Sequence, residues 1–224
     1  MRFIHQLKDW PNFKWDKTLV LERLVQVRNK QGYVLGKMEG LGFSLKSEAN
    51  LDTLISDVTK SSEIEGEILD KDQVRSSIAR KLGLDIAGLV PSDRDVDGVV
   101  EMMLDATQRH DEILTAQRLF NWHTSLFPTG KSGIFPIVVG QWRDNLGSDP
   151  MQVVSGPLGR EKVHFEAPSS DRLETEMDSF LAWINSEHDL DAVLKAAVAH
   201  LWFVTIHPFD DGNGRITRAI TDMQ

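Results

Sequence analysis

The sequence predicts an all-α fold that carries one small β-hairpin. Three observations support this prediction. Apolar residues recur at helical spacing through most of the 224 residues, Gly and Pro gather with short β-favouring runs between residues 130 and 168, and cysteine is absent. With no disulfide framework available, the core has to come from helix packing. The length suits one large domain with a small appendage.

Composition narrows the classes of partner. A net charge of -9 argues against a nucleic-acid-binding face, which needs a basic patch. The start of the chain lacks the apolar stretch of a signal peptide. The most apolar segment, residues 190–206, contains Asp191, Lys195 and His200 and is too short to cross a bilayer. We therefore expect a cytoplasmic protein without membrane or nucleic-acid partners.

The first part of the chain, residues 1–45, is predicted to form a small N-terminal helical region. An aromatic stretch at residues 10–15, broken by Pro11, is expected to cap the first helix. Asp16 can serve as the N-cap of a helix that runs toward Phe43. Glycines at positions 32, 36, 40 and 42 weaken helix propensity and leave its far end open.

A second helix is predicted over residues 47–65, inside a segment bounded at 46 and 70. Its apolar stripe consists of Leu51, Leu54, Ile55 and Val58. Seven residues beyond Val58, the same face reaches Glu65, at a helix C-terminus where the dipole disfavours a negative charge. Gly66 is a natural helix stop. Either Glu65 has a cationic partner, or this end frays into solvent.

The remaining elements follow from similar patterns. Helices are predicted at about 70–82, 93–110, 115–127, 170–186 and 190–206, the last apolar nearly all round and therefore central. Asp171 and Glu174 can form a capping box at the start of the helix over 170–186. Residues 151–165 read as a β-hairpin, and Arg143 just ahead of it can be structural or functional.

The densest chemistry lies in residues 207–218, at the start of the last helix. This stretch contains a histidine that can act as a base, two adjacent carboxylates, two glycines and two arginines. Backbone N–H groups around Gly212 and Gly214 can cradle an anion at the helix N-terminus. Arg215 and Arg218 lie three residues apart and share a helix face, and Asp211 offers the hard oxygen that Mg²⁺ prefers beside phosphates. This stretch can hold a metal-nucleotide beside a base.

The same stretch resembles the signature of the Fic (filamentation induced by cAMP) family, H-x-F-x-D/E-G-N-G-R-x-x-R. The fixed positions are His207, Phe209, Asp211, Gly212, Asn213, Gly214, Arg215 and Arg218. Ser61, Glu65 and Gly66 match the family's inhibitory pattern S/T-x-x-x-E-G/N, and the opening of the chain resembles the small N-terminal region of some bacterial members.

The resemblance implies a domain plan. It assigns residues 46–70 to an inhibitory helix and residues 71–224 to a mainly helical Fic catalytic core with a flap at about 151–165. Because family members usually continue past the helix that carries Arg218, a chain truncated at its C-terminus is expected. The family's habit also suggests a homodimer.

The resemblance further implies an adenylyltransferase that moves AMP from ATP to a Ser, Thr or Tyr hydroxyl of a target protein. His207 would be the general base and Asp211 would hold Mg²⁺. Arg218 would grip the γ-phosphate unless Glu65 pairs with it, which would inhibit the chain. Nucleotide binding would involve Gly212, Asn213, Gly214, Arg215 and Arg218, and Phe209 would anchor the loop.

The target protein would dock on the hairpin flap. The implied docking residues are Met151, Gln152, Val153, Val154, Val163 and His164. Three alternatives to AMP transfer stay open at this stage: removal of AMP from a modified protein in the same site, transfer of another nucleotide or phosphate group, and a non-catalytic nucleotide-binding interaction module.

Overall fold

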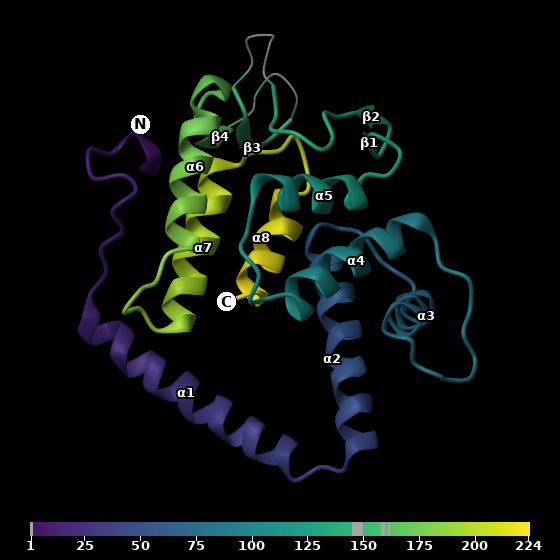
Figure 1. Cartoon of the computed structure of the whole chain (residues 1–224). Coiled ribbons are helices and arrows are strands. Elements are labelled where there is room, and N and C mark those ends of the chain that lie inside the picture. The colour runs from purple at the N-terminus through teal and green to yellow at the C-terminus, as the bar shows by residue number, and fades with distance from the viewer. Residues whose placement is uncertain (1, 145–149, 158–159, 161) are drawn as a thin grey trace.

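The computed structural model describes residues 2–144, 150–157, 160 and 162–224. It confirms the mainly helical prediction (Figure 1). The helices are α1 (Lys17–Glu39), α2 (Phe43–Ile64), α3 (Lys71–Leu82), α4 (Arg94–Gln108), α5 (Ala116–Leu126), α6 (Leu173–Ile184), α7 (Ala192–Ile206) and α8 (Asn213–Asp222). Short 3₁₀ turns, η1 (Ile4–Gln6) and η2 (Ser170–Arg172), precede α1 and α6.

Two antiparallel hairpins accompany the helices. The expected one pairs β3 (Gln152–Ser155) with β4 (Lys162–Glu166), and the register shifts between Val153 and Val154. The second, β1 (Lys131–Ser132) with β2 (Phe135–Pro136), was not predicted. Two-residue strands are too short to show an alternating pattern, so the glycine at position 133 was the available signal in the sequence. In the structure Gly133 forms the turn with a φ of 57°.

The core is organised around α8, which packs against α7, α4, α2 and α5. In Figure 1 this helix lies in the middle of the molecule, between the α6–α7 pair and the α2–α4–α5 group. Phe203 and Ile206 at the end of α7 are completely buried, as are Ile216 and Ile220 on α8. Because α8 is buried on several sides, its N-terminus, which lies inside the stretch 207–218, is held at a fixed place.

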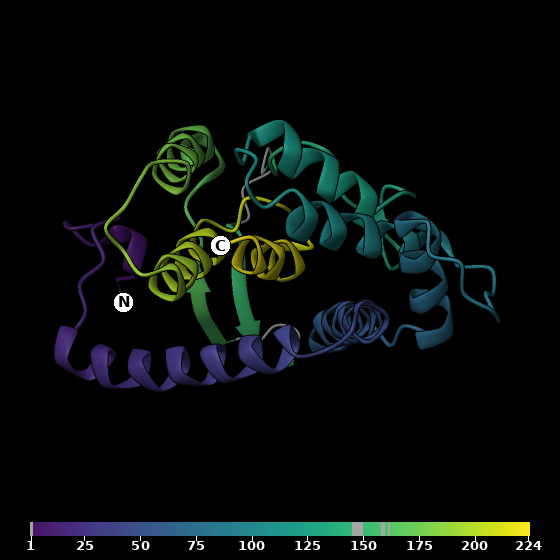
Figure 2. The same cartoon turned by 60° about the horizontal axis from the view of Figure 1, so that its bottom comes forward.

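Helix α1 lies apart from this core. It contains no buried residue, and Figures 1 and 2 show it running along one edge of the molecule. The N-cap prediction is confirmed, since the Asp16 side chain accepts hydrogen bonds from the N–H groups of Thr18 and Leu19. An ion pair between Arg28 and Asp191, at 2.5 Å, connects α1 to the start of α7.

The aromatic stretch ahead of α1 does not cap that helix. Instead, Trp10 and Phe13 lie with their ring centroids 6.1 and 5.8 Å from that of Trp202 on α7, and the Trp10 indole N–H donates to Glu176. The reason is burial: α7 and α6 offer large apolar rings to pack against, whereas α1 is exposed along its length.

Helix α6 lies within the segment 170–186 that was predicted to be helical, and it buries Leu173, Met177, Phe180 and Ile184. The capping box expected from Asp171 and Glu174 is wrong. The turn η2 includes Asp171, and α6 begins after Arg172 without a side-chain cap.

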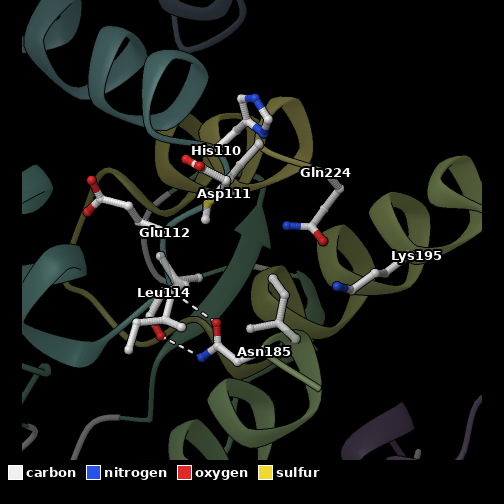
Figure 3. A pocket seen from close by; sticks show the side chains of 10 residues that line it. His110, Asp111, Glu112, Leu114, Asn185, Lys195 and Gln224 are labelled. Carbon is white, nitrogen blue, oxygen red and sulfur yellow. Dashed lines mark hydrogen bonds between the residues drawn. The ribbon is translucent and has the colours of Figure 1, made fainter. Parts of the chain in front are cut away.

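Asn185, just past α6, fastens the connection between α4 and α5. Its side-chain amide accepts from the Leu114 N–H and donates to the Leu114 carbonyl, at 2.8 and 2.7 Å (Figure 3). The pocket that surrounds this contact is also lined by Lys195 and Gln224, and none of the motif residues 207–218 lines it. Among the described residues, no helix is long and apolar enough to cross a membrane.

Candidate active site

His207 is the residue at which α7 ends. Its backbone adopts a left-handed conformation, with φ of 53°, and within the described residues it is the one non-glycine residue with a positive φ. Such a conformation is uncommon outside glycine and is typical of functional sites. It turns the chain sharply and leads it into the loop that precedes α8.

Hydrogen bonding sets the state of the His207 ring. Its Nδ1 lies 3.4 Å from the carbonyl oxygen of Val204, which can only accept, so Nδ1 carries the proton and Nε2 is left as an acceptor. Burial lowers the pKa of His207 below its usual value of 6.5. The imidazole is therefore neutral at pH 7 and can accept a proton at Nε2.

Arg143 holds the backbone on both sides of this turn. Its Nε donates to the His207 carbonyl at 2.8 Å, its backbone N–H donates to the Pro208 carbonyl at 2.8 Å, and its guanidinium also contacts the Pro168 carbonyl. The side chain is buried. The structural interpretation of Arg143 is thus the one that its contacts support: it joins the base of the hairpin to the His207 turn.

Phe209 and His123 form the floor beneath the loop. Phe209 is completely buried, and its ring stacks on that of His123 at a centroid distance of 4.2 Å. His123 accepts from the Gly140 N–H through Nδ1 and donates to the Asp211 carbonyl through Nε2, both at 3.2 Å. His123 itself is completely buried, so it supports the loop from within the core.

These contacts make His123 a source of acid sensitivity. Burial lowers its pKa to about 4, because the charged ring would lose its hydration. A proton on Nδ1 would also face the Gly140 N–H with a second donor. Stability is complete above the unfolded pKa of about 6.5 and is lost as pH falls from there toward 4, by about 3 kcal/mol at most. In urea titrations, His123→Gln should show a smaller loss of unfolding free energy between pH 7 and pH 4 than the unmodified chain. Equal losses in both proteins would contradict this assignment.

The loop closes on itself through Asn213. Its side chain accepts from the Phe209 N–H at 3.0 Å and donates to the Phe209 carbonyl at 2.8 Å, and it is buried. The Asn213 side chain thus fixes the loop through one N–H and its carbonyl oxygen. The backbone N–H groups at the start of α8 lack intrahelical acceptors and can bind an anion.

Two carboxylates flank the loop. Asp211 accepts from the Gly212 N–H at 2.6 Å and from the Ser132 hydroxyl on β1, so the unpredicted hairpin supports the candidate metal ligand. Asp210 accepts from the Val138 N–H at 2.9 Å. The described residues hold no group of three or more His, Asp or Glu side chains that could bind a metal ion together.

Glu65 and Arg218 form the ion pair that the sequence suggested. Arg218 Nη2 lies 2.7 Å from Glu65 Oε1, while its Nε donates to the Ser61 hydroxyl and Nη2 also donates to the Ser61 carbonyl. The Glu65 carboxylate also lies directly over Gly214: a Cβ atom at that position would be 2.0 Å from Oε1. An internal carboxylate thus occupies the N-terminal end of α8.

Arg215 points to a different neighbour. Its side chain is only 4% exposed, Nη1 lies 2.6 Å from Glu67 Oε2, and the guanidinium carbon is 5.1 Å from the centre of the Phe127 ring. Glu67 belongs to none of the sequence patterns described above. The available signal was its place two residues after Glu65, in the turn that follows α2.

The hairpin flap presents apolar side chains to solvent. Val153, Val154 and Val163 are all exposed, and the His164 ring contacts the Ser155 hydroxyl at 2.6 Å. Met151 and Gln152 are half-buried, and the Met151 carbonyl accepts from the Ala167 N–H. The tip at residues 158–159 and 161 lies outside the described residues.

The site therefore combines a neutral imidazole, a glycine-lined helix N-terminus and an arginine held by an internal acid. Known proteins with similar sequences show which family has this combination. Residues 113–224 match the Fic/DOC family, and residues 3–84 match a domain of unknown function, DUF4172. The chain belongs to the Fic/DOC family.

Several relatives carry the name "Protein adenylyltransferase Fic". The one from Culex quinquefasciatus is 27% identical over 216 residues, which cover 90% of this chain and 38% of that protein. The one from Drosophila melanogaster is 40% identical over 77 residues, which cover 32% of this chain and 15% of that protein. This chain thus spans well under half the length of these relatives.

Solved structures share the fold. A Fic domain containing signaling protein from Bacteroides thetaiotaomicron superimposes with a TM-score of 0.63 at 24% identity, covering 87% of this chain and 70% of that one. Fic-1 from C. elegans superimposes with a TM-score of 0.59 at 19% identity, covering 92% and 58%.

Proposed function

We propose that this protein transfers AMP from ATP to a Ser, Thr or Tyr hydroxyl of another protein. The observation that carries the proposal is the position of His207. Its neutral imidazole, whose Nε2 has no hydrogen-bond partner among the described residues, stands at the start of the loop that leads into α8. At the N-terminus of that helix a carboxylate lies over Gly214. The shared name of several relatives supports the same reaction class.

The residues of this chain would divide the work as follows. His207 Nε2 would accept the proton from the incoming hydroxyl as its oxygen attacks the α-phosphorus and pyrophosphate leaves. Arg143, by gripping the carbonyls on both sides of the turn, keeps the ring in place during the transfer. The Gly212 and Gly214 backbone would receive the phosphates, and Arg218 would bind the γ-phosphate.

The donor set fits one Mg²⁺ ion held by a single protein carboxylate and by phosphate oxygens. Asp211 is half-buried at the start of the loop, and each of its oxygens accepts one hydrogen bond and keeps a lone pair. When bound, the ion would neutralise charge on the phosphates. Arg215 would add positive charge from beneath the loop, where it is buried.

Autoinhibition is the second part of the proposal. Glu65 lies against Gly214 and pairs with Arg218, so it would compete with the γ-phosphate for both. Ser61 would hold Arg218 in the inhibited position, and Gly66 would permit the turn, since its φ is 83°. The target protein would add an extended segment to the open edge of the β3–β4 flap, with Val153 and Val163 among the contacts.

One observation favours a second activity, removal of AMP from a modified protein. The Glu65 side chain is 38% exposed and close enough to His207 to influence its titration. A carboxylate in that place could orient a water molecule for hydrolysis. AMP release from a modified target, lost in Glu65→Gln, would support this second activity.

Mass spectrometry of the intact chain tests the transferred group. Glu65→Gly protein is incubated with magnesium and, separately, ATP, UTP and CTP. We expect a mass gain of one AMP with ATP, by self-modification, and little or none with the other two. Equal gains with all three nucleotides, or gain of a bare phosphate from ATP, would contradict adenylyl transfer.

A further inference from the structure

The turn that follows α2 directs two acidic side chains toward α8. Gly66, in the left-handed conformation, allows its own N–H to donate to the Glu63 carbonyl and the Glu67 N–H to donate to the Ser62 carbonyl, both at 3.0 Å. This is the Schellman arrangement of a helix C-terminus. It places Glu65 and Glu67 on either side of the glycine, and each reaches a different arginine of α8.

The two arginines of these ion pairs differ in how much of each side chain is exposed. Arg215 is 4% exposed, whereas Arg218 is 21% exposed. A guanidinium taken out of water needs a counter-ion, and removing the partner of a buried charge is costly. The Arg215 Nε atom is buried without a hydrogen-bond partner among the described residues, so Glu67 is the acid on which this charge depends. Arg215 is thus the more buried of the two arginines, while its partner Glu67 is 47% exposed.

We propose that Glu67 is a positioning residue for the inhibitory acid. By pairing with buried Arg215, it fixes the 65–67 turn on α8 and so keeps the Glu65 carboxylate over Gly214. This inference rests on the proposed function, because it assumes that Glu65 competes with nucleotide. Glu67 acts through Glu65 and need not touch the nucleotide itself.

The positioning role predicts a specific pattern of dependence. Glu67→Gln keeps the size of the side chain and an acceptor oxygen but removes the charge. With Glu65 present, we expect the KM for ATP in self-modification to fall about three- to tenfold with little change in kcat, because a loosened turn weakens the competitor. In the Glu65→Gly background, Glu67→Gln should lower the KM for ATP much less, since no inhibitory acid remains to be placed and only the charge near Arg215 changes.

The experiment compares Glu67→Gln, Glu65→Gly, the double variant and the unmodified full chain. Glu63→Gln is the matched control, because Glu63 lies in the same turn of α2 but pairs only with Lys60 at the surface among the contacts of the described residues. Hydrogen exchange of the Gly66 and Glu67 amides gives a second measurement that needs no activity. Their protection should fall in Glu67→Gln and stay unchanged in Glu63→Gln.

Unchanged exchange and unchanged KM in Glu67→Gln would overturn the positioning role. So would an equal fall in KM in both backgrounds, which would show direct competition of Glu67 with nucleotide. If Glu65→Gly itself neither binds ATP nor modifies itself, the proposed function fails, and the exchange measurement still decides whether Glu67 fixes the turn.

Discussion

Replacing Glu65 with glycine is expected to raise self-modification by AMP about tenfold to a hundredfold. The estimate follows from the value of a hydrogen bond to a charged group, about 1.5–3 kcal/mol, which the γ-phosphate would no longer have to displace. Arg218 would then be free of its 2.7 Å contact with Glu65, and the space over Gly214 would be open to a phosphate. Label transferred from α-labelled ATP measures the gain.

Glu63→Gly is the matched control for this substitution. It removes one negative charge and adds one glycine at the same end of α2, and the side-chain contact that it breaks within the described residues is the exposed ion pair with Lys60. Its transfer rate should equal that of the unmodified chain. If Glu65→Gly behaves like this control, the ion pair with Arg218 has no inhibitory role.

Removing the base should have the opposite and larger effect. In the Glu65→Gly background, His207→Ala is expected to lower the transfer rate about 10²–10⁴-fold, the usual contribution of general-base assistance. ATP affinity should stay nearly constant, since His207 would act on the hydroxyl and not on the phosphates. His200→Gln is the control, because the His200 ring contacts Thr221 within the helix packing.

The rate should also depend on pH in a defined direction. Neutral His207 is the competent form, and burial lowers its pKa below 6.5. The Glu65→Gly protein should therefore keep a constant rate from pH 8 to pH 7 and lose it only in more acidic buffer, as the imidazole becomes protonated. A rate that falls between pH 8 and pH 7, or full activity in His207→Ala, would show that another group is the base.

Sequence periodicity was sufficient for the larger elements of the fold. Asp16 marked the start of α1, and α6 and α7 lie inside the segments 170–186 and 190–206 that were predicted to be helical. These features depend on neighbours along the chain. The pair between Glu65 and Arg218 joins residues 153 positions apart, and it was expected because both segments resemble patterns of the family. Helix polarity alone had left Glu65 with either a cationic partner or a frayed end.

What the sequence did not reveal depends on contacts between distant segments. The bonds from Arg143 to the carbonyls of His207 and Pro208, and from Ser132 to Asp211, join residues more than sixty positions apart. Asn213 belongs to the motif, yet its side chain is used inside the loop. Glu67 carried no pattern of its own, and its importance depends on the burial of Arg215.

The central claim is that Glu65 and the γ-phosphate of ATP compete for Arg218. Titration calorimetry of magnesium-ATP and magnesium-ADP against the unmodified chain and Glu65→Gly tests it most directly. We predict that the unmodified chain binds the two nucleotides about equally, and that Glu65→Gly binds ATP about tenfold more tightly than ADP, because only ATP offers a γ-phosphate to the freed arginine. Equal affinities for ATP and ADP in Glu65→Gly would contradict the claim.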